Sequence, residues 1–495
     1  MMLYHRVLLL VWLAALGLGS SARAGLPEAA PPPPADDRLR TLEAENRDLQ
    51  RQLADIRQRL GLPATSPAKS EPTANVTDIL LGRDPQPPKA EPKSAGAKID
   101  LKNGVRLSSA DDRFRVEFHD LSQFEARITN PNGDPLHNTF NIPRQRFYFA
   151  GQIDTYFDFY TSLNRGYGTL DIFDSYVNFK FDPAFNLRVG RTKTPYSYEY
   201  YKIADGDLIA PERSLFVGNL APNRQVGAML YGRGLDERIE YAVGLFNGPH
   251  RSFQDFNNYK NPFLYVNTRP FLHGTNDVLR NLNLGASANY GRENDPLEPT
   301  ALRTANDETT AAAIDSVAPA FLKFNPDAKE VGETAFWSGD VAWFYRRFTM
   351  LAMYNGGFMT YSQPKNPSTR VPFSGFSVAA TYFLTGEEIT SRKSVEPIRD
   401  FDLRDPFQSP GAIEAYSRIS YLNAGSNVYT SGLVDPKLWS NDAAVTDVGV
   451  NWYVNRYVRI FLDWQHSHYG SPVQVGPGRL TKSSDLFWVR TQLYY

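Results

Sequence analysis

Hydrophobic and polar residues alternate with a period of two through most of the chain beyond residue 98. From Arg146 to Tyr160, apolar residues occupy most of the odd positions and polar or charged residues most of the even ones. Because successive side chains of a strand point to opposite faces, this period predicts that Arg146–Tyr160 is one strand with an apolar and a polar face. Similar stretches recur at Leu282–Asn289, Trp337–Arg346, Phe376–Tyr382, Asp447–Val454 and Val458–Gln465.

The length of these stretches favours a membrane barrel over a soluble sandwich, which would also alternate but with shorter strands. Many run for about ten residues, as expected of a tilted strand that crosses a bilayer. Beyond the N-terminal region no segment holds the ~20 unbroken apolar residues of a membrane-spanning helix, so a membrane protein of this sequence is expected to be a barrel. Dividing roughly 390 residues by about 24 per strand and loop gives about sixteen strands. We therefore predict an all-β fold, a transmembrane antiparallel β-barrel over residues 99–495 with a water-filled lumen.

The last strand supports this prediction. Apolar side chains alternate with larger polar ones from Phe487 onward, and the chain ends on the aromatic Tyr495. A terminal aromatic residue resembles the signal that barrel-assembly machinery reads, with Tyr here in place of the usual Phe. We expect this segment to close the barrel.

Two segments with different patterns open the chain. Residues 1–24 combine a short polar start, an apolar run from Val7 to Leu18 and an Ala22-Arg23-Ala24 cleavage motif, which predicts a signal peptide. Residues 36–61 carry a heptad seam and predict a short coiled-coil helix. The alternative is a single amphipathic helix packed on its own domain. The seam consists of Leu39, Leu42, Asn46, Leu49, Leu53, Ile56 and Leu60.

Residues 62–98 are rich in Pro, Ala, Lys, Ser and Glu, and this composition predicts an extended periplasmic linker. Contact with the cell wall through residues 25–98 is one expectation for this region, and a solvated spacer is the other. Asn46 in the core of the heptad seam is of the kind that fixes register and strand number at some cost in stability.

Composition narrows the function. The chain has no cysteine, which removes disulfides, zinc-thiolate sites and cysteine nucleophiles together. Its 27 Tyr, 31 Phe and 7 Trp fit aromatic girdles at two membrane interfaces. The chain carries 53 Lys and Arg against 54 Asp and Glu, and loss of Arg6 and Arg23 with the signal peptide leaves a net charge of −3. A near-neutral balance argues against nucleic acid as a partner.

Motifs of catalysis and metal binding are weak. There is no nucleotide-binding loop and no G-x-S-x-G elbow, so we expect no enzyme and no cofactor. His466 and His468 are two apart, a spacing that could bind a metal. Their phase places them on the same face as Trp464, and we therefore expect an interfacial pair with no metal.

The region from Gly190 to Arg224 is too long for a tight hairpin turn and contains several basic residues. A selective pore needs charges that replace part of an anion's hydration, and the planar fork of Arg binds oxyanions with two hydrogen bonds. We expect this region to form the constriction; the alternative is a solvated external loop of mixed charge. The predicted anion-binding residues are Arg146, Arg191, Lys193, Arg213 and Arg224.

Over most of residues 100–495 the sequence resembles the phosphate-selective porin family, the porins O and P. The resemblance rests on the order of several segments. They are Pro143–Arg146, Val189–Pro195 followed by Glu199, Glu212–Leu215 with Arg224 and Gly227, Tyr382–Glu387, Gly411–Arg418 and Gly449–Tyr453. It implies a sixteen-stranded trimeric porin, a third loop folded into the lumen, and an inner row of Arg and Lys that draws oxyanions through.

We therefore expect a porin in the outer membrane of a Gram-negative-type bacterium, passing small solutes by passive diffusion with a preference for phosphate-like anions. It would contact outer-membrane lipid, form a homotrimer and hold its coiled coil in the periplasm. One alternative is a general, non-selective diffusion porin with a basic row facing an acidic row. The other is a barrel anchor that tethers the outer membrane to the cell wall through its coiled coil.

Overall fold

A computed structural model of the chain describes residues 97–495, apart from 103, 133–135, 167–168, 249, 251–252, 307–317 and 365. The chain divides into two units, Met1–Glu91 and Pro92–Tyr495, and the described residues belong to the second. The predicted signal peptide and coiled coil, and nearly all of the predicted linker, lie outside the described residues.

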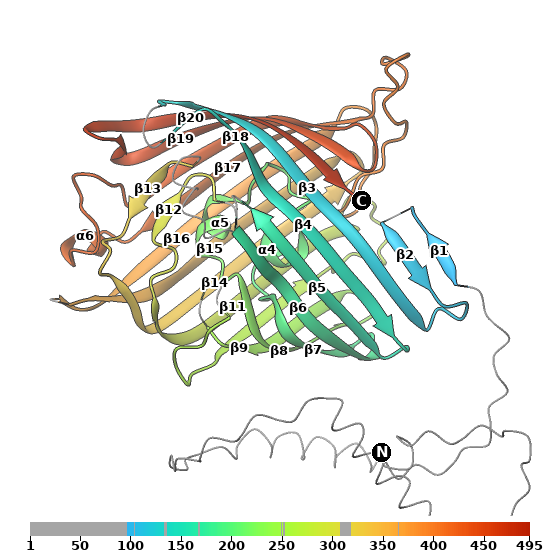
Figure 1. Cartoon of the computed structure of the whole chain (residues 1–495), viewed down its shortest axis with the longest axis horizontal. Coiled ribbons are helices and arrows are strands. Elements are labelled where there is room, and N and C mark those ends of the chain that lie inside the picture. The colour runs from blue at the N-terminus through green and yellow to red at the C-terminus, as the bar shows by residue number, and fades with distance from the viewer. Residues whose placement is uncertain are drawn as a thin grey trace, which may run out of the picture. The chain divides into compact units, whose positions relative to one another are not determined.

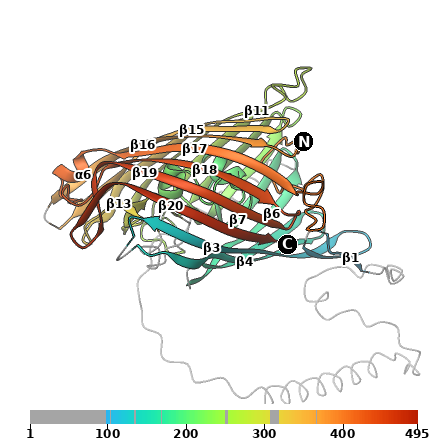
Figure 2. The ribbon, with the colours of Figure 1, turned by 90° about the horizontal axis from the view of Figure 1, so that it is seen from above.

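Sixteen antiparallel strands form a closed barrel (Figures 1 and 2). Each strand pairs with the next along the chain, and β20 pairs with β3 to close the sheet. The predicted barrel and its strand number are therefore confirmed. The strands are β3 (Phe114–Asn130), β4 (Thr139–Ile153), β5 (Phe157–Gly166), β6 (Thr169–Asp182), β7 (Phe185–Lys193), β8 (Arg224–Gly234), β9 (Ile239–Phe246), β10 (Asn261–Thr268), β11 (Asn281–Pro296), β14 (Lys329–Tyr345), β15 (Phe348–Gln363), β16 (Asn366–Phe383), β17 (Ala412–Ala424), β18 (Asp442–Tyr453), β19 (Val458–Gly476) and β20 (Arg479–Tyr494).

The remaining elements are short. A hairpin of β1 (Lys98–Asp100) and β2 (Val105–Ser108) extends the first barrel strand through pairing of β2 with β3. A separate hairpin, β12 (Ala301–Arg303) and β13 (Ala320–Lys323), lies between β11 and β14. The helices are α4 (Tyr198–Lys202), α5 (Leu215–Leu220) and α6 (Asn427–Thr430). Among the described residues, no helix is long and apolar enough to cross a membrane.

The alternation read from the sequence sets the inner and outer faces. Phe147 and Phe149 of β4 are 38% and 41% exposed on the outer surface, whereas Arg146 is buried on the lumen side. One expectation for this region is wrong: Arg146–Tyr160 is two strands rather than one, because β4 ends at Ile153 and β5 starts at Phe157. The pattern hides the turn, since Gly151 pairs with Phe159 and odd-numbered residues therefore point outward on both sides of it.

The two ends of the barrel differ in the length of their connections. Most connections at the end that holds Tyr495 are two to four residues long, such as 183–184 and 346–347. The connections 194–223 and 297–328 are at the opposite end. Because such barrels have short periplasmic turns and longer outer loops, we assign the latter end to the cell exterior. The exceptions at the periplasmic end are the connections 269–280 and 384–411, both described throughout.

Residues 194–223, the third outer loop, fold into the lumen and cross it. At one side the Tyr196 hydroxyl donates to the carbonyl of Trp337 in β14 at 3.1 Å. At the other, Arg459 of β19 donates to the carbonyl of Leu208 at 2.7 Å, and Arg490 of β20 donates to that of Pro211. This position confirms the inward loop that the family resemblance implies.

Two inward-folded segments therefore form a hydrophobic core inside the barrel. Leu215 and Phe216 of α5 are buried in one cluster with Leu302 of β12 and Phe321 of β13. The side chain of Asn219 joins the two segments, because its amide both donates to and accepts from the backbone of Arg303, each at 2.8 Å. The third loop is thus packed against the β12–β13 hairpin and hydrogen-bonded to β14, β19 and β20 inside the barrel.

Candidate functional site

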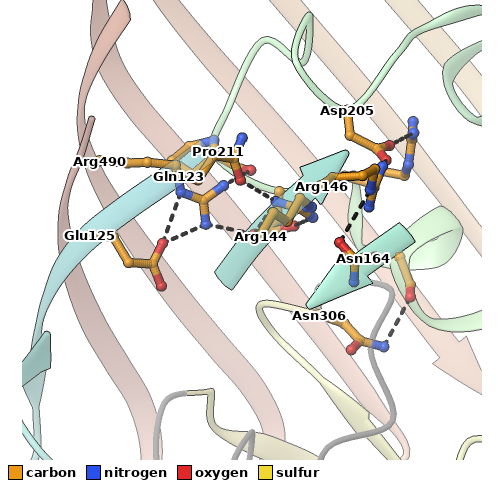
Figure 3. A network of polar contacts seen from close by, with 12 residues as sticks. Gln123, Glu125, Arg144, Arg146, Asn164, Asp205, Pro211, Asn306 and Arg490 are labelled. Atoms are coloured by element: carbon orange, nitrogen blue, oxygen red, sulfur yellow. Dashed lines mark hydrogen bonds and ion pairs between the residues drawn. The ribbon is translucent and has the colours of Figure 1, made fainter. Parts of the chain in front are cut away.

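Four of the five predicted basic residues meet around one carboxylate, Asp205, in the inward-folded loop. Figure 3 shows Asp205 with Arg146. The guanidinium groups of Arg146 and Arg213 donate hydrogen bonds to this carboxylate. Lys193 Nζ and Arg224 Nη2 each lie 3.6 Å from one of its oxygens. We call these five residues the Asp205 cluster.

The fold explains why these residues meet. Arg146 points inward because of its phase in β4, and Lys193 pairs with Arg224 where β7 and β8 bracket the third loop. The loop itself supplies Asp205 and Arg213. Two of the cations contact the ring of Phe173, with the guanidinium carbons of Arg146 and Arg224 at 4.2 and 3.8 Å from its centroid. Such contacts attract cations to the ring face and help to hold like charges close together.

The charges around Asp205 decide its protonation. Burial alone would raise the pKa of the Asp205 carboxyl, but the positive charges of Lys193, Arg146, Arg213 and Arg224 outweigh that effect. They hold the pKa of Asp205 well below its usual range, so the group stays ionised at neutral pH. The cluster therefore has more positive than negative charge.

Most of these cations are buried where they bind Asp205 of the third loop. Arg146, Arg213 and Arg224 are 2%, 4% and 2% exposed, whereas the side chain of Lys193 is 17% exposed. Lys193 also donates to the carbonyls of Tyr200 at 3.2 Å and Ile203 at 3.3 Å. Within the cluster, Lys193 is the cation whose side chain is most exposed, whereas the three arginines are buried.

Arg191 lies apart from Asp205. Its Nε donates to the carbonyl of Phe173 at 3.1 Å, and its guanidinium lies 4.0 Å from the ring centroid of Phe253. Its nearest carboxylate is that of Asp171, 3.7 Å away. The structure thus brings Arg146, Lys193, Arg213 and Arg224 together and places Arg191 beside them on another carboxylate.

A second cluster, which the sequence reading did not place in the site, is centred on Glu212 of the same loop. Figure 3 shows three of its members, Glu125, Arg144 and Arg490. Arg144 of β4 binds the Glu212 carboxylate through both terminal nitrogens, and Arg490 of β20 donates to it at 2.6 Å. Arg490 and Arg127 in turn share the carboxylate of Glu125. These five residues are the Glu212 cluster. The inward phase of Arg127 and Arg490 was readable from the sequence, but their partners were not.

Together the clusters concentrate positive charge on one side of the lumen. Seven cations share four carboxylates, an excess of three charges once Asp174, the ion-pair partner of Arg224, is included. Acidic residues gather on a different wall, formed by β11 and β14, where four carboxylate side chains are buried. They are Glu293, Asp295, Glu330 and Asp340.

Tyrosines line the lumen on the periplasmic side of the third loop, and the sequence reading also left them out of the site. The rings of Tyr148 and Tyr160 lie 6.1 Å apart, those of Tyr160 and Tyr176 lie 5.1 Å apart, and Tyr494 contacts Tyr148 edge-on. Three of these rings border a cavity of about 240 Å³ that also touches Gly206 of the loop. The alternation along their strands places these tyrosines on the lumen face, and this was the signal in the sequence that could have included them in the site.

Comparison with known proteins identifies the family. The model of the phosphate-selective porin O and P family matches residues 114–495, the whole barrel. The chain belongs to this family. The porin therefore forms a channel in the outer membrane, and the resemblance drawn from its motifs is confirmed. A search of curated protein sequences gave no match.

Solved structures of other outer-membrane proteins resemble this one at low identity. OmpT of Vibrio cholerae in its trimer form is 12% identical, with 78% of this chain and 100% of that chain covered and a TM-score of 0.48. The anion-selective porin of Comamonas acidovorans is 9% identical, with 77% and 100% covered and a TM-score of 0.46. The outer membrane channel DcaP of Acinetobacter baumannii is 8% identical, with 78% and 99% covered and a TM-score of 0.44.

The histidine pair of the porin lies where its phase predicts. His466 and His468 share the outer face of β19 with Trp464, and His466 Nδ1 lies 2.9 Å from Asp485 Oδ1. The indole of Trp464 donates to the same carboxylate at 3.0 Å. Among the described residues, no three His, Cys, Asp or Glu side chains converge as a metal site would require.

Proposed function

We propose that this porin lets small solutes diffuse passively across the outer membrane and prefers anions, phosphate among them. The observation that carries the proposal is the Asp205 cluster: four cations around one carboxylate, inside the lumen, on the loop that narrows it. The neighbouring Glu212 cluster adds to the positive excess on the same side.

The physical mechanism combines a field with one direct contact. Low-dielectric walls focus the potential of the buried guanidinium groups into the remaining aqueous path and raise the local concentration of anions there. Lys193 is partly exposed and offers a compact ammonium charge that an oxyanion can bind through hydrogen bonds. One exposed cation flanked by Asp205 binds less tightly than several would, which lets the anion leave as well as enter.

The experiment is single-channel recording in planar lipid bilayers. In a KCl gradient the reversal potential should show anion preference, and added phosphate should reduce the chloride current by competing for Lys193. Lys193→Gln should weaken both effects. Lys437→Gln, at an exposed lysine of the outer loop 425–441, is the matched control and should leave them unchanged. Cation preference without any effect of phosphate would refute the proposal.

A second candidate function is general diffusion with little selectivity. It is favoured by the buried carboxylates of Asp340 and Glu330 on β14, which oppose the basic side of the lumen. A basic wall and an acidic wall produce a transverse field that orients solutes of either sign. Under this alternative the reversal potential would be near zero, and Lys193→Gln would change conductance for both ions alike.

We further propose that the porin is a homotrimer with its coiled coil on the periplasmic side. The heptad seam of residues 36–61 supports self-association, although three heptads alone are only marginally stable. Native mass spectrometry of the detergent-solubilised porin should give three times the chain mass. A monomeric mass under conditions that preserve the barrel would contradict the proposal.

A further inference from the structure

A small cavity lies on the acidic wall near the outer end of the barrel. Its volume is about 30 Å³, room for one or two particles the size of water. Several side chains with oxygen acceptors border it, among them Asn261 of β10, Asn289 and Glu293 of β11, and Glu330 of β14. Gln225, Glu298, Thr334 and His250 also line the cavity. None of the residues of the Asp205 cluster lines it.

The strand register brings these side chains together. Asn289, Glu293 and Asp295 share the inward face of β11, and Glu330 pairs with Asp295 across the β11–β14 ladder. Gly291 lies between Asn289 and Glu293, and a Cβ there would lie 2.1 Å from Asn261 Oδ1. The amide of Asn261 therefore fills the space that a side chain would need. Asn261 Nδ2 donates to Glu293 Oε1 at 2.6 Å, and the amide oxygen of Asn261 takes no part in this hydrogen bond and lies beside Gly291.

These oxygens lack donors. Among the described residues, none donates a hydrogen bond to Asn261 Oδ1, Asn289 Oδ1, Glu293 Oε2 or either carboxylate oxygen of Asp295. The residues that carry these oxygens, Asn261, Asn289, Glu293 and Asp295, are at most 7% exposed. No ion pair with Lys or Arg is formed by Glu293, Asp295 or Glu330 in the part of the chain that the structure describes. Buried carboxylates without a partner are unfavourable unless something neutralises them.

We propose that this cavity binds a divalent cation through two carboxylates, Glu293 and Glu330, and two amides, Asn261 and Asn289, with Ca²⁺ as the best match to these donors. This mixed donor set differs from a group of three acidic or histidine side chains, of which the described residues hold none. Carboxylate and amide oxygens are the ligands that Ca²⁺ prefers, and Ca²⁺ tolerates irregular geometry. A proton shared by Glu293 and Asp295 would neutralise one charge but give nothing to the amide oxygens of Asn261 and Asn289. Mg²⁺ fits less well because it keeps several of its waters, for which the cavity has little room.

The ion would link the outer connection 297–328 to the acidic wall formed by β11 and β14. Asn261, Glu293 and Glu330 come from three adjacent strands, and Glu330 Oε1 also accepts the backbone N–H of Glu298 at 3.0 Å. The chain from Glu298 runs directly into β12, which packs over α5 of the constriction loop. Binding would therefore stabilise the segment that packs on α5 inside the barrel, and this inference does not depend on which ion the pore prefers.

Isothermal titration with CaCl₂ tests the site, using the purified porin in zwitterionic detergent after treatment with EDTA. We expect one Ca²⁺ per chain, Mg²⁺ binding weaker by at least about tenfold, and a rise in thermal unfolding temperature with Ca²⁺. Glu293→Gln should abolish binding. Asn289→Ala should weaken it by at least about tenfold, whereas Asn289→Asp should keep it.

Two controls keep the result decisive. Asp327→Asn removes an exposed carboxylate of the same outer loop and should leave Ca²⁺ binding unchanged. If Glu293→Gln fails to fold by circular dichroism, the pair Asn289→Ala and Asn289→Asp decides the matter, since neither removes a charge. No binding by the unmodified porin at millimolar Ca²⁺, or equal binding by all variants, would overturn the proposal.

Discussion

Replacing Asp205 by Asn gives the sharpest test of the electrostatic reasoning. The substitution keeps the size and one acceptor oxygen of the side chain but removes the single negative charge at the centre of four cations. We expect the anion preference of the pore to increase, because a repulsive charge next to Lys193 disappears.

The structure sets the size of this effect. Lys193 Nζ lies 3.6 Å from Asp205, and an anion hydrogen-bonded to the other side of the ammonium would be within about 6 Å of the carboxylate. Removing a unit charge at that distance favours the anion by about 0.7 kcal/mol in water and about 2.8 kcal/mol at an effective dielectric constant near 20. These values correspond to about 3-fold and about 100-fold tighter binding.

The assay is block of the chloride current by phosphate in planar bilayers, measured at low and high ionic strength. The half-blocking phosphate concentration should fall in Asp205→Asn, and the change should shrink as salt screens the lumen. Asp485→Asn, on the outer face of the barrel, is the control and should have no effect. An unchanged or higher half-blocking concentration in a folded Asp205→Asn porin would refute the reasoning.

Three further predictions concern stability and organisation. First, the pKa of Asp205 is lowered in the folded porin. Its ion pairs therefore stabilise the folded state fully at pH values above the ordinary pKa of 3.8, and this stabilisation is lost as the pH falls below it. In thermal unfolding, the difference in stability between the unmodified porin and Asp205→Asn should disappear only below about pH 4. Second, Arg392→Met leaves the Glu414 carboxylate buried without its guanidinium partner and should cost about 3–5 kcal/mol, seen as easier unfolding in urea. Adding Glu414→Gln should restore most of that loss, and a double variant no more stable than the single one would contradict the pairing. Third, deletion of residues 25–97 should leave single-channel conductance intact while weakening sedimentation of the porin with cell-wall fragments; loss of conductance from a correctly folded barrel would argue against a separate tether.

The alternation of side chains could be read directly from the sequence because it is a local property of strands. It placed Arg146 and Arg490 toward the lumen, and Phe147 and Trp464 toward the outside. The strand number followed separately, from the length of the barrel region divided by the length of one strand and its loop. The alternation failed at the turn after Ile153, where the parity of inward and outward residues continues unchanged through the reversal of the chain.

The composition of the clusters was decided by the tertiary structure alone. Glu212 joins Arg144 of β4 to Arg490 of β20 although 278 residues separate Glu212 from Arg490, and no local pattern encodes that meeting. Asp205 collects Arg146, Lys193 and Arg224 only because the third loop turns inward and crosses the lumen. Sequence spacing specified which side chains face water. The closure of the barrel and the path of one loop determined which of them share a carboxylate, since charges interact through space and not along the chain.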